Sequence, residues 1–378
     1  MERVGGNKKF ITMKQKTPTW TLLLIIYFTA LILAGCEKEN ETPSPENNWT
    51  YLGLEDKWVT TVEDTPWGLF AGTSRNGVFH YNESNNTWTP LGLDHAPISE
   101  LAFADTGEPM ILAAVRCCPP DYPDQGTTAA VYASWDAGET WHERDGGLAE
   151  QNDYNFWANS LLVDNENPKR MYFGGSTYQL LYSDDAGKTW DHISGQEDSF
   201  GGATRTIALS PKRDGRIWFG GSNAFFYPTI YRSDNWGSNA ETIYWGQFEN
   251  SVRKIVIDRS NEDLMWWIQT GGVDMSEDGG DSMEHGVLAP ARDENEYVRF
   301  TGLLQSSYRT LYAVGNLFCD QNSFEDHKIR LYNSSTLGNL WHKLNVPENG
   351  SGATNLKLDK KQRLLVTTAN GLWRFEKE

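Results

Sequence analysis

A short pattern that occurs twice almost unchanged constrains the fold of this chain more than any other feature of the sequence. Ser134–Trp141 reads SWDAGETW and Ser183–Trp190 reads SDDAGKTW, so Ser, Asp, Gly, Thr and Trp recur at identical spacing. Weaker copies lie at Ser276–Ser282 and Ser233–Gly237, and eroded ones at Thr87–Trp88 and Trp341. A pattern that recurs along a chain in this way indicates one structural unit per copy.

The residue types of the pattern are those of a tight turn. The Asp carboxylate accepts hydrogen bonds from turn amides, Gly adopts the positive φ that such a turn needs, and Trp buries a large apolar surface. We expect Asp136 and Asp185 to be turn residues and not catalytic acids. The residues to which we assign this structural role are Ser134, Asp136, Gly138, Trp141, Ser183, Asp185, Gly187, Trp190 and Asp278.

The pattern resembles the Asp-box, or BNR repeat, of β-propeller proteins, which reads S-x-D-x-G-x-T-W. Proteins with this repeat include sialidases, sortilin-like receptors, xyloglucan-cleaving enzymes and photosystem assembly factors. The resemblance implies an all-β propeller of four-stranded antiparallel blades. It also implies that each box forms the hairpin between the third and fourth strands of a blade.

The strand pattern predicts seven blades. Alternating apolar strands separated by polar turns begin near Val59, Ile98, Trp157, Thr204, Val252, Val298 and Ala353. The last blade ends at Gly371–Phe375, which leaves too little chain for its fourth strand. Asn47–Leu54 closely matches Asn85–Leu93, the predicted fourth strand of the first blade. We therefore expect the N-terminal strand to complete the last blade and to close the ring, which protects its edges.

The segment before the propeller has the features of a signal peptide, at residues 1–35, and a flexible tether, at residues 36–46. A basic stretch precedes the apolar run Thr21–Ala34, which is shorter than the ~20 residues of a membrane-spanning helix. The run ends in Leu33–Cys36, LAGC, which resembles the lipobox of bacterial lipoproteins and implies lipid attachment at Cys36; the alternative is an ordinary secretory signal with a chance cysteine. The sequence leaves open whether translation starts at Met1 or Met13.

The tether is polar and contains no apolar residue, so it cannot bury a core. Its acidic residues directly after Cys36 resemble the export signal of surface lipoproteins in Bacteroidetes. We expect an outer-membrane lipoprotein exposed at the cell surface, with a periplasm-facing orientation as the alternative, and residues 47–378 as the propeller.

Charge and motifs exclude several classes of partner and cofactor. The net charge of -18 argues against binding to nucleic acid, and against membrane contact other than through the lipid anchor. The seven histidines are scattered, and neither His-Glu-x-x-His nor Cys-x-x-Cys occurs, so we expect no metal. No glycine-rich loop leads into a helix for a nucleotide phosphate. We expect no cofactor and a monomer.

Three cysteines lie in the propeller besides Cys36. Cys117 and Cys118 are adjacent in a loop of the second blade, and Cys319 lies in a loop of the sixth. An odd number of cysteines in an oxidising compartment leaves one unpaired within the chain. A vicinal disulfide that leaves Cys319 free and a bridge between the two loops both remain open.

Long loops indicate where a binding site would lie. The loops between second and third strands are long at Arg116–Ala129, Ser222–Pro228 and Gly315–Lys328. In a propeller these loops share the face opposite the box turns, and loops on a rigid scaffold carry function. We place the candidate site there, over the central channel.

The first strands can be aligned on a shared apolar residue, and the position two residues before it carries arginine in three blades. The residues at this position, in blade order, are Val59, Ser99, Asn159, Arg205, Arg253, Arg299 and Thr354. Three guanidiniums that converge at the channel would bind a carboxylate, sulfate or phosphate. The alternative is that each arginine pairs with an acidic residue of a neighbouring blade. Aromatic and polar residues that would help to bind a sugar, or that would merely pack between blades, are Trp58, His95, Asp153, Tyr154, Trp157 and Tyr297.

We favour a binding module that holds a glycan, acidic sugars included, or a protein partner on the loop face. The first alternative is a glycoside hydrolase or lyase that acts on an acidic polysaccharide and needs two carboxylates at one bond. The Arg-Ile-Pro motif of sialidases is absent, since Arg216–Trp218 reads RIW. The second alternative is an assembly or scaffold propeller, for which we expect a plugged channel and salt-bridged arginines. The fold alone does not choose among them.

Overall fold

The computed structural model describes one propeller unit. It covers residues 48–116, 129–147, 158–175, 180–192, 202–223, 225–246, 251–269, 271–288, 296–319, 327–347 and 349–376. The chain divides into residues 1–46 and 47–378, and the described residues belong to the second unit. The predicted signal peptide, tether and lipid-attachment residue Cys36 lie outside the described residues, as do Cys117, Cys118, Asp153, Tyr154 and Trp157. The described part contains no helix that is long and apolar enough to cross a membrane.

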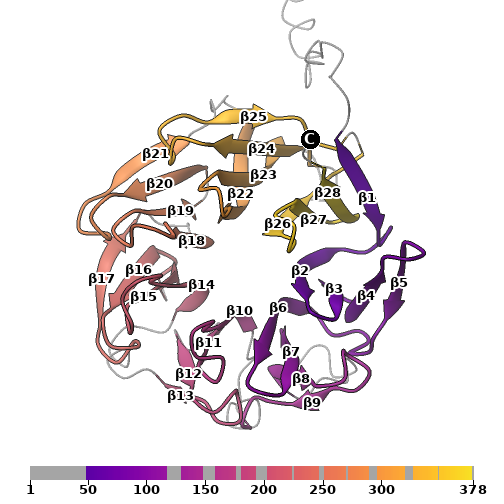
Figure 1. Ribbon diagram of the computed structural model, residues 1–378. Helices are drawn as coiled ribbons and strands as arrows, with labels where there is room; N and C mark the ends of the chain where they lie inside the picture. The colour runs from indigo at the N-terminus through magenta and orange to yellow at the C-terminus, as the bar shows by residue number, and fades with distance from the viewer. Residues whose placement is uncertain are drawn as a thin grey trace, which may run out of the picture. The chain divides into compact units, whose positions relative to one another are not determined.

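The described residues form seven four-stranded antiparallel sheets arranged in a ring, which confirms the predicted seven-bladed, all-β fold (Figure 1). The first strands are β2 (Val59–Thr65), β6 (Ile98–Asp105), β10 (Ala158–Val163), β14 (Ala203–Leu209), β18 (Lys254–Ile257), β22 (Glu296–Gln305) and β26 (Ala353–Leu358). The second strands are β3 (Gly68–Thr73), β7 (Pro109–Val115), β11 (Met171–Gly175), β15 (Ile217–Ser222), β19 (Met265–Gln269), β23 (Leu311–Cys319) and β27 (Leu364–Thr368).

The third strands are β4 (Val78–Asn82), β8 (Val131–Ser134), β12 (Leu181–Ser183), β16 (Pro228–Ser233), β20 (Gly272–Ser276), β24 (Ile329–Ser334) and β28 (Gly371–Phe375). The fourth strands are β5 (Thr87–Pro90), β9 (His142–Glu143), β13 (Asp191–His192), β17 (Ala240–Trp245), β21 (Glu284–Leu288), β25 (His342–Leu344) and β1 (Trp49–Gly53). First strands line the centre of the ring, and fourth strands form its rim (Figure 1).

The two ends of the chain meet in the last blade, as the sequence predicts. Its strand order is β1-β28-β27-β26, and Trp49 pairs with Phe375 in antiparallel register. The Trp49 ring packs against Phe375 with centroids 5.1 Å apart, and its indole Nε1 donates to the carbonyl of Asn345 in the sixth blade at 3.0 Å. Ring closure thus rests on a strand from the N-terminus that also binds a neighbouring blade.

The core lies between neighbouring blades. Each sheet packs against a blade on both of its faces, so both faces of a second strand are buried. Residues 110–115 of β7 are all buried, and Trp266 and Trp267 of β19 are both 0% exposed although they point to opposite faces. This explains why second strands are almost continuously apolar, whereas fourth strands at the rim are mostly exposed.

The repeated pattern forms the turns between third and fourth strands, and we call these segments the repeat turns. In five blades a glycine amide donates to the Ser Oγ four residues earlier, at Gly138, Gly187, Gly237, Gly280 and Gly338. The Asp136 carboxylate accepts from the backbone N–H of Thr140 at 2.9 Å and from its hydroxyl at 2.5 Å. Thr336 replaces the Asp in the sixth blade and accepts from the N–H of Leu340 at 2.8 Å.

The tryptophans that follow the turns fasten each blade to the one before it. Trp141 Nε1 donates to the carbonyl of Leu91 at 2.6 Å, and Trp190 Nε1 donates to the carbonyl of Arg144 at 3.0 Å. Trp88, in an eroded copy, donates to the carbonyl of Leu52 at 2.7 Å. A buried indole N–H needs an acceptor, so the Trp both fills the space between blades and fixes their spacing.

Candidate functional site

A β-bulge at the start of the first strands turns one residue of each blade toward the central channel. The register of six first strands shifts by one residue near the loop end, and a bulge of this kind re-aims the side chain of the extra residue. The extra residues are Thr60, Ser99, Asn159, Arg205, Thr301 and Thr354. In the fifth blade Arg253 occupies the corresponding place directly before β18, with its N–H bonded to the carbonyl of Ile268.

This register corrects two positions of the sequence alignment. In the sixth blade Arg299 pairs with Asn316, and the residue that corresponds to Arg205 and Arg253 is Thr301. In the first blade it is Thr60, because Val59 is buried between blades. The alignment was wrong there because neither Val59 nor Arg299 lies two residues before an apolar residue. Thr60 and Thr301 do, since they lie two residues before the buried Val62 and Leu303.

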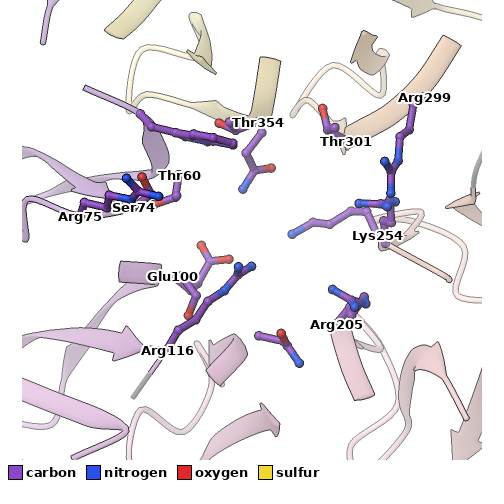
Figure 2. A pocket seen from close by; sticks show the side chains of 15 residues that line it. Thr60, Ser74, Arg75, Glu100, Arg116, Arg205, Lys254, Arg299, Thr301 and Thr354 are labelled. Atoms are coloured by element: carbon purple, nitrogen blue, oxygen red, sulfur yellow. The ribbon is translucent and has the colours of Figure 1, made fainter. Parts of the chain in front are cut away.

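All seven of these residues line one cavity of about 440 Å³ in the channel, at its loop end (Figure 2). This volume lies in the range of small-ligand pockets, roughly 300–1,000 Å³. The cavity is lined by Trp58, Thr60, Ser74, Arg75, Ser99, Glu100, Arg116, Asn159, Arg205, Arg253, Lys254, Arg299, Thr301, Thr354 and Asn355. Arg299 therefore lines the same cavity as Arg205 and Arg253, although it lies two residues before Thr301, nearer the loop face.

The arginines of this cavity have no acidic partners in the described part of the chain. Among the described residues, no carboxylate forms an ion pair with Arg116, Arg205, Arg253 or Arg299, and the buried Nε atoms of Arg253 and Arg299 have no hydrogen-bond acceptor. Arg299 lies over the ring of Phe318, 5.6 Å from its centroid. Arg253 and Arg299 are partly buried, whereas Arg116 and Arg205 are exposed within the channel. The cavity therefore presents positive charge that a ligand would neutralise.

Burial and neighbouring charges shift the pKa values of two of these guanidiniums. Burial, together with the nearby charges of Arg299 and Arg205, lowers the pKa of Arg253 to about 9. Burial, then Arg116 and Arg299, lower the pKa of Arg205. Arg253 therefore stays charged at neutral pH, and the cavity holds a cluster of like charges whose mutual repulsion a bound anion would relieve.

A group of two acids and two lysines lies beside the arginines. Lys357 Nζ is 2.9 Å from Glu100 Oε1 and 3.5 Å from Glu63 Oε2, and the hydroxyl of Thr61 donates to Glu100 at 3.0 Å. Burial raises the pKa of Glu100, but the nearby charges of Lys357 and Lys254 outweigh burial, so the pKa is lowered overall. Glu100 is thus committed to Lys357, and it does not neutralise the arginines.

The remaining lining residues suit a polar ring-shaped ligand. Trp58, which is 36% exposed, offers an aromatic face, and Asn159, Asn355 and Ser74 offer amide and hydroxyl groups. Guanidiniums bind carboxylate, sulfate or phosphate through paired N–H groups. The cavity therefore combines donors for an anion with an apolar face and hydrogen-bonding groups.

Two other residues singled out from the sequence, His95 and Tyr297, are not among the residues that line the cavity. His95 is exposed in a turn between the first two blades, and Tyr297 stacks on Phe318 with ring centroids 5.5 Å apart. Cys319 ends β23, whereas its two candidate partners lie outside the described residues. Within the described residues, no group of three or more His, Cys, Asp or Glu side chains could hold a metal ion.

Sequence reasoning missed Arg75, Arg116, Glu100 and Lys254. Arg116 directly follows β7, and Arg75 lies two residues after β3 in the adjacent blade, at the end that faces the loops. Aligning the ends of the second strands as well as the starts of the first strands would have found them. Glu100 and Lys254 each directly follow a residue aimed at the channel, and an alternating strand pattern assigns such positions to a face between blades.

Comparison with solved structures places this fold among known propellers. The chain is similar to the GH74 xyloglucanase from Xanthomonas campestris, with a TM-score of 0.65, 14% identity and coverage of 86% of this chain and 53% of that chain. It is similar to YCF48 from Cyanidioschyzon merolae, with a TM-score of 0.59, 14% identity and coverage of 86% and 98%. A streptogramin B lyase gives a TM-score of 0.60, 11% identity and coverage of 86% and 96%.

The likeness is one of fold. Identities this low carry no function from one propeller to another, and this chain spans about half of the xyloglucanase. No protein-family model and no curated protein sequence matches the chain.

Proposed function

We propose that the channel cavity binds the anionic part of an acidic glycan, and that the protein is a surface glycan-binding lipoprotein. The observation that carries this proposal is the convergence of Arg116, Arg205, Arg253 and Arg299 without acidic partners among the described residues. An uncompensated cationic cluster in a protein of net charge -18 needs a local reason, and a bound anion supplies one.

The lining chemistry favours a sugar acid over a bare anion. A sugar ring has an apolar face that can stack on Trp58, and its hydroxyl groups can bond to Asn159 and Asn355. The cavity volume of about 440 Å³ suits one or two sugar units rather than a folded protein surface.

The two alternatives have less support from the described residues. Hydrolysis by paired carboxylates needs two of them, roughly 5–10 Å apart, at one bond. Glu100 is the carboxylate among the described lining residues, and Lys357 and Thr61 already bind it. A scaffold role predicts salt-bridged arginines and a filled channel, whereas these arginines have no carboxylate partner in the part of the chain that the structure describes, and they line a cavity.

Calorimetric titration of residues 47–378, which contain every described strand, tests this proposal. We expect digalacturonate to bind and its neutral counterpart digalactose not to bind, with an affinity that falls as salt is added. Arg253→Gln should weaken the binding, whereas Arg259→Gln, an exposed arginine outside the cavity, should leave it unchanged. Equal binding of the charged and neutral sugars, or equal effects of the two variants, would contradict an anion site.

The sequence-based location is part of the proposal. Lipid attachment at Cys36 would hold the protein at the membrane through its acyl chains. We expect Cys36→Ser to move the protein from the membrane fraction to the soluble fraction, whereas Cys319→Ser should not. Protease treatment of intact cells then separates surface exposure, in which the protein is cut, from a periplasm-facing orientation, in which it is protected.

We further propose that the repeat turns are Asp-boxes. Their Ser, Asp and Gly residues use the hydrogen bonds that the motif requires, and the Trp that follows packs against the preceding blade. On this proposal the turns are structural, and any ligand binds on the opposite face.

A further inference from the structure

Two lysines reach the centre of the ring, and their surroundings differ. Lys357, on β26, bridges Glu63 and Glu100 at 3.5 and 2.9 Å. Although burial opposes its charge, these two carboxylates raise its pKa above the ordinary value. Lys357 is therefore a fixed cation that holds two acids together.

Lys254, on β18, lines the cavity but has no ion pair among the described residues. Figure 2 shows its side chain extending into the cavity from the side opposite Arg116. Burial lowers its pKa, Lys357 adds to this effect, and Glu100 and Glu63 offset part of it. The unpaired lysine thus loses its proton more readily than an ordinary surface lysine.

A lysine with a lowered pKa in a cavity that also holds guanidiniums has a specific chemistry. Only the unprotonated amine is nucleophilic, and burial near other cations is a known way to activate a lysine toward carbonyl carbons. The arginines of the same cavity would hold a carboxylate, and they would place a carbonyl group bonded to that carboxylate near the amine. Charge and nucleophile therefore meet in one cavity.

We propose that Lys254 forms a reversible imine with an anion that carries an aldehyde or ketone next to its carboxylate, that is, a 2-oxo acid. The lone pair of Nζ attacks the carbonyl carbon, a C–N bond forms, and the C–O bond then breaks. The carbonyl oxygen leaves as water with the two hydrogens of the amine, so no oxidant or reductant is needed. This inference rests on the proposed anion site and names the reactive end of the ligand that it would accept.

Reductive trapping tests the proposal. Residues 47–378 are incubated with glyoxylate and sodium cyanoborohydride, which reduces an imine to a stable secondary amine, and the modified lysines are identified by peptide mass spectrometry. We expect the Lys254 peptide to be labelled faster than every other lysine peptide. Glycolaldehyde, an aldehyde of similar size without the carboxylate, should lose this preference, because the arginines no longer hold it.

Variants separate the possible outcomes. Lys254→Arg removes the nucleophile, so the preferential label should disappear and no other lysine peptide should take it up. Lys357→Arg is the matched control and should leave the labelling of Lys254 in place. Arg205→Gln should slow the labelling by glyoxylate but not that by glycolaldehyde.

Two results would overturn the imine proposal without touching the anion site. One is uniform labelling of lysines in the wild-type protein, a result that does not depend on whether any variant folds. The other is glyoxylate labelling that is no faster than glycolaldehyde labelling at Lys254. Failure of digalacturonate to bind, together with selective labelling of Lys254, would instead overturn the glycan proposal and leave the reactive amine.

Discussion

The repeat turns and the channel cavity both contain charged side chains, but the chain provides hydrogen-bond partners for the charges of the turns and no acidic partners, among the described residues, for the arginines of the cavity. The carboxylates of Asp136 and Asp278 are exposed, and each accepts several hydrogen bonds within its own turn. The guanidiniums of Arg205, which is exposed, and Arg253, which is partly buried, line the channel cavity, and no carboxylate among the described residues forms an ion pair with either. A charge that the chain itself satisfies serves the fold, whereas a charge that it leaves unsatisfied at cost to the fold indicates a ligand.

Removing charge from the two regions should therefore have unequal effects on binding. We expect Arg205→Gln/Arg253→Gln to lower digalacturonate affinity at least about a hundredfold, because each hydrogen bond to a charged group is worth ~1.5–3 kcal/mol. Asp136→Asn/Asp185→Asn, which removes two charges from the turns, should leave the affinity unchanged. Calorimetric titration of both variants decides the point, and equal losses would end the distinction between the regions.

A second pair of variants tests whether the residue at the channel position of a first strand stabilises the fold in every blade, or only where it has a hydrogen-bond partner. Thr354 occupies the same bulge position as Arg253, yet its hydroxyl donates to the carbonyl of Val59 in the first blade at 2.6 Å. Thr354→Val should lower the free energy of unfolding by ~1–3 kcal/mol, because a buried carbonyl loses its donor. Arg253→Gln should raise it, because an uncompensated charge leaves the cluster. Urea unfolding measures both, and a loss of stability in both variants would mean that this position is structural in every blade.

Most of the fold could be predicted from the sequence because its determinants are local. The repeat turns carry their own hydrogen bonds within about five residues, and the likeness of Asn47–Leu54 to Asn85–Leu93 revealed the closing strand. Two arginines of the site, Arg205 and Arg253, could be predicted for the same reason, since both lie beside an intact apolar anchor.

The rest of the site depends on register between strands, which the sequence does not display. The register of the sixth blade places Thr301, and not Arg299, at the position of Arg253, although the longer β22 still brings Arg299 to the cavity. Lys254 could be placed on its strand, but its difference from Lys357 depends on which glutamates the ring brings near each lysine. Contacts across the channel join residues far apart in the chain, so no local pattern marks them.

The smallest expected effect concerns the turns at low pH. Hydrogen bonds from the side chain and backbone N–H of Thr140, then from Ser134, lower the pKa of Asp136 from 3.8 to about 2. Those from Ser282 act in the same way on Asp278. A carboxylate with a depressed pKa in the folded state adds stability above its unfolded pKa, and this stability is lost as pH falls from 3.8 toward 2. The wild-type protein should therefore lose stability in this window.

Asn can replace these carboxylates with little change in the turn, since Asn235 accepts from the N–H of Asn239 at 2.9 Å in the fourth blade. Asp136→Asn/Asp278→Asn should lose less stability than the wild type when the urea midpoint is followed down to pH 2, and the exposed Asp94→Asn should follow the wild type. If the double variant shows the same acid sensitivity as the wild type, these hydrogen bonds form as strongly to the protonated acid. The charge of the turns would then add no stability to the fold, and the contrast with the channel would no longer rest on how the turns satisfy their charge.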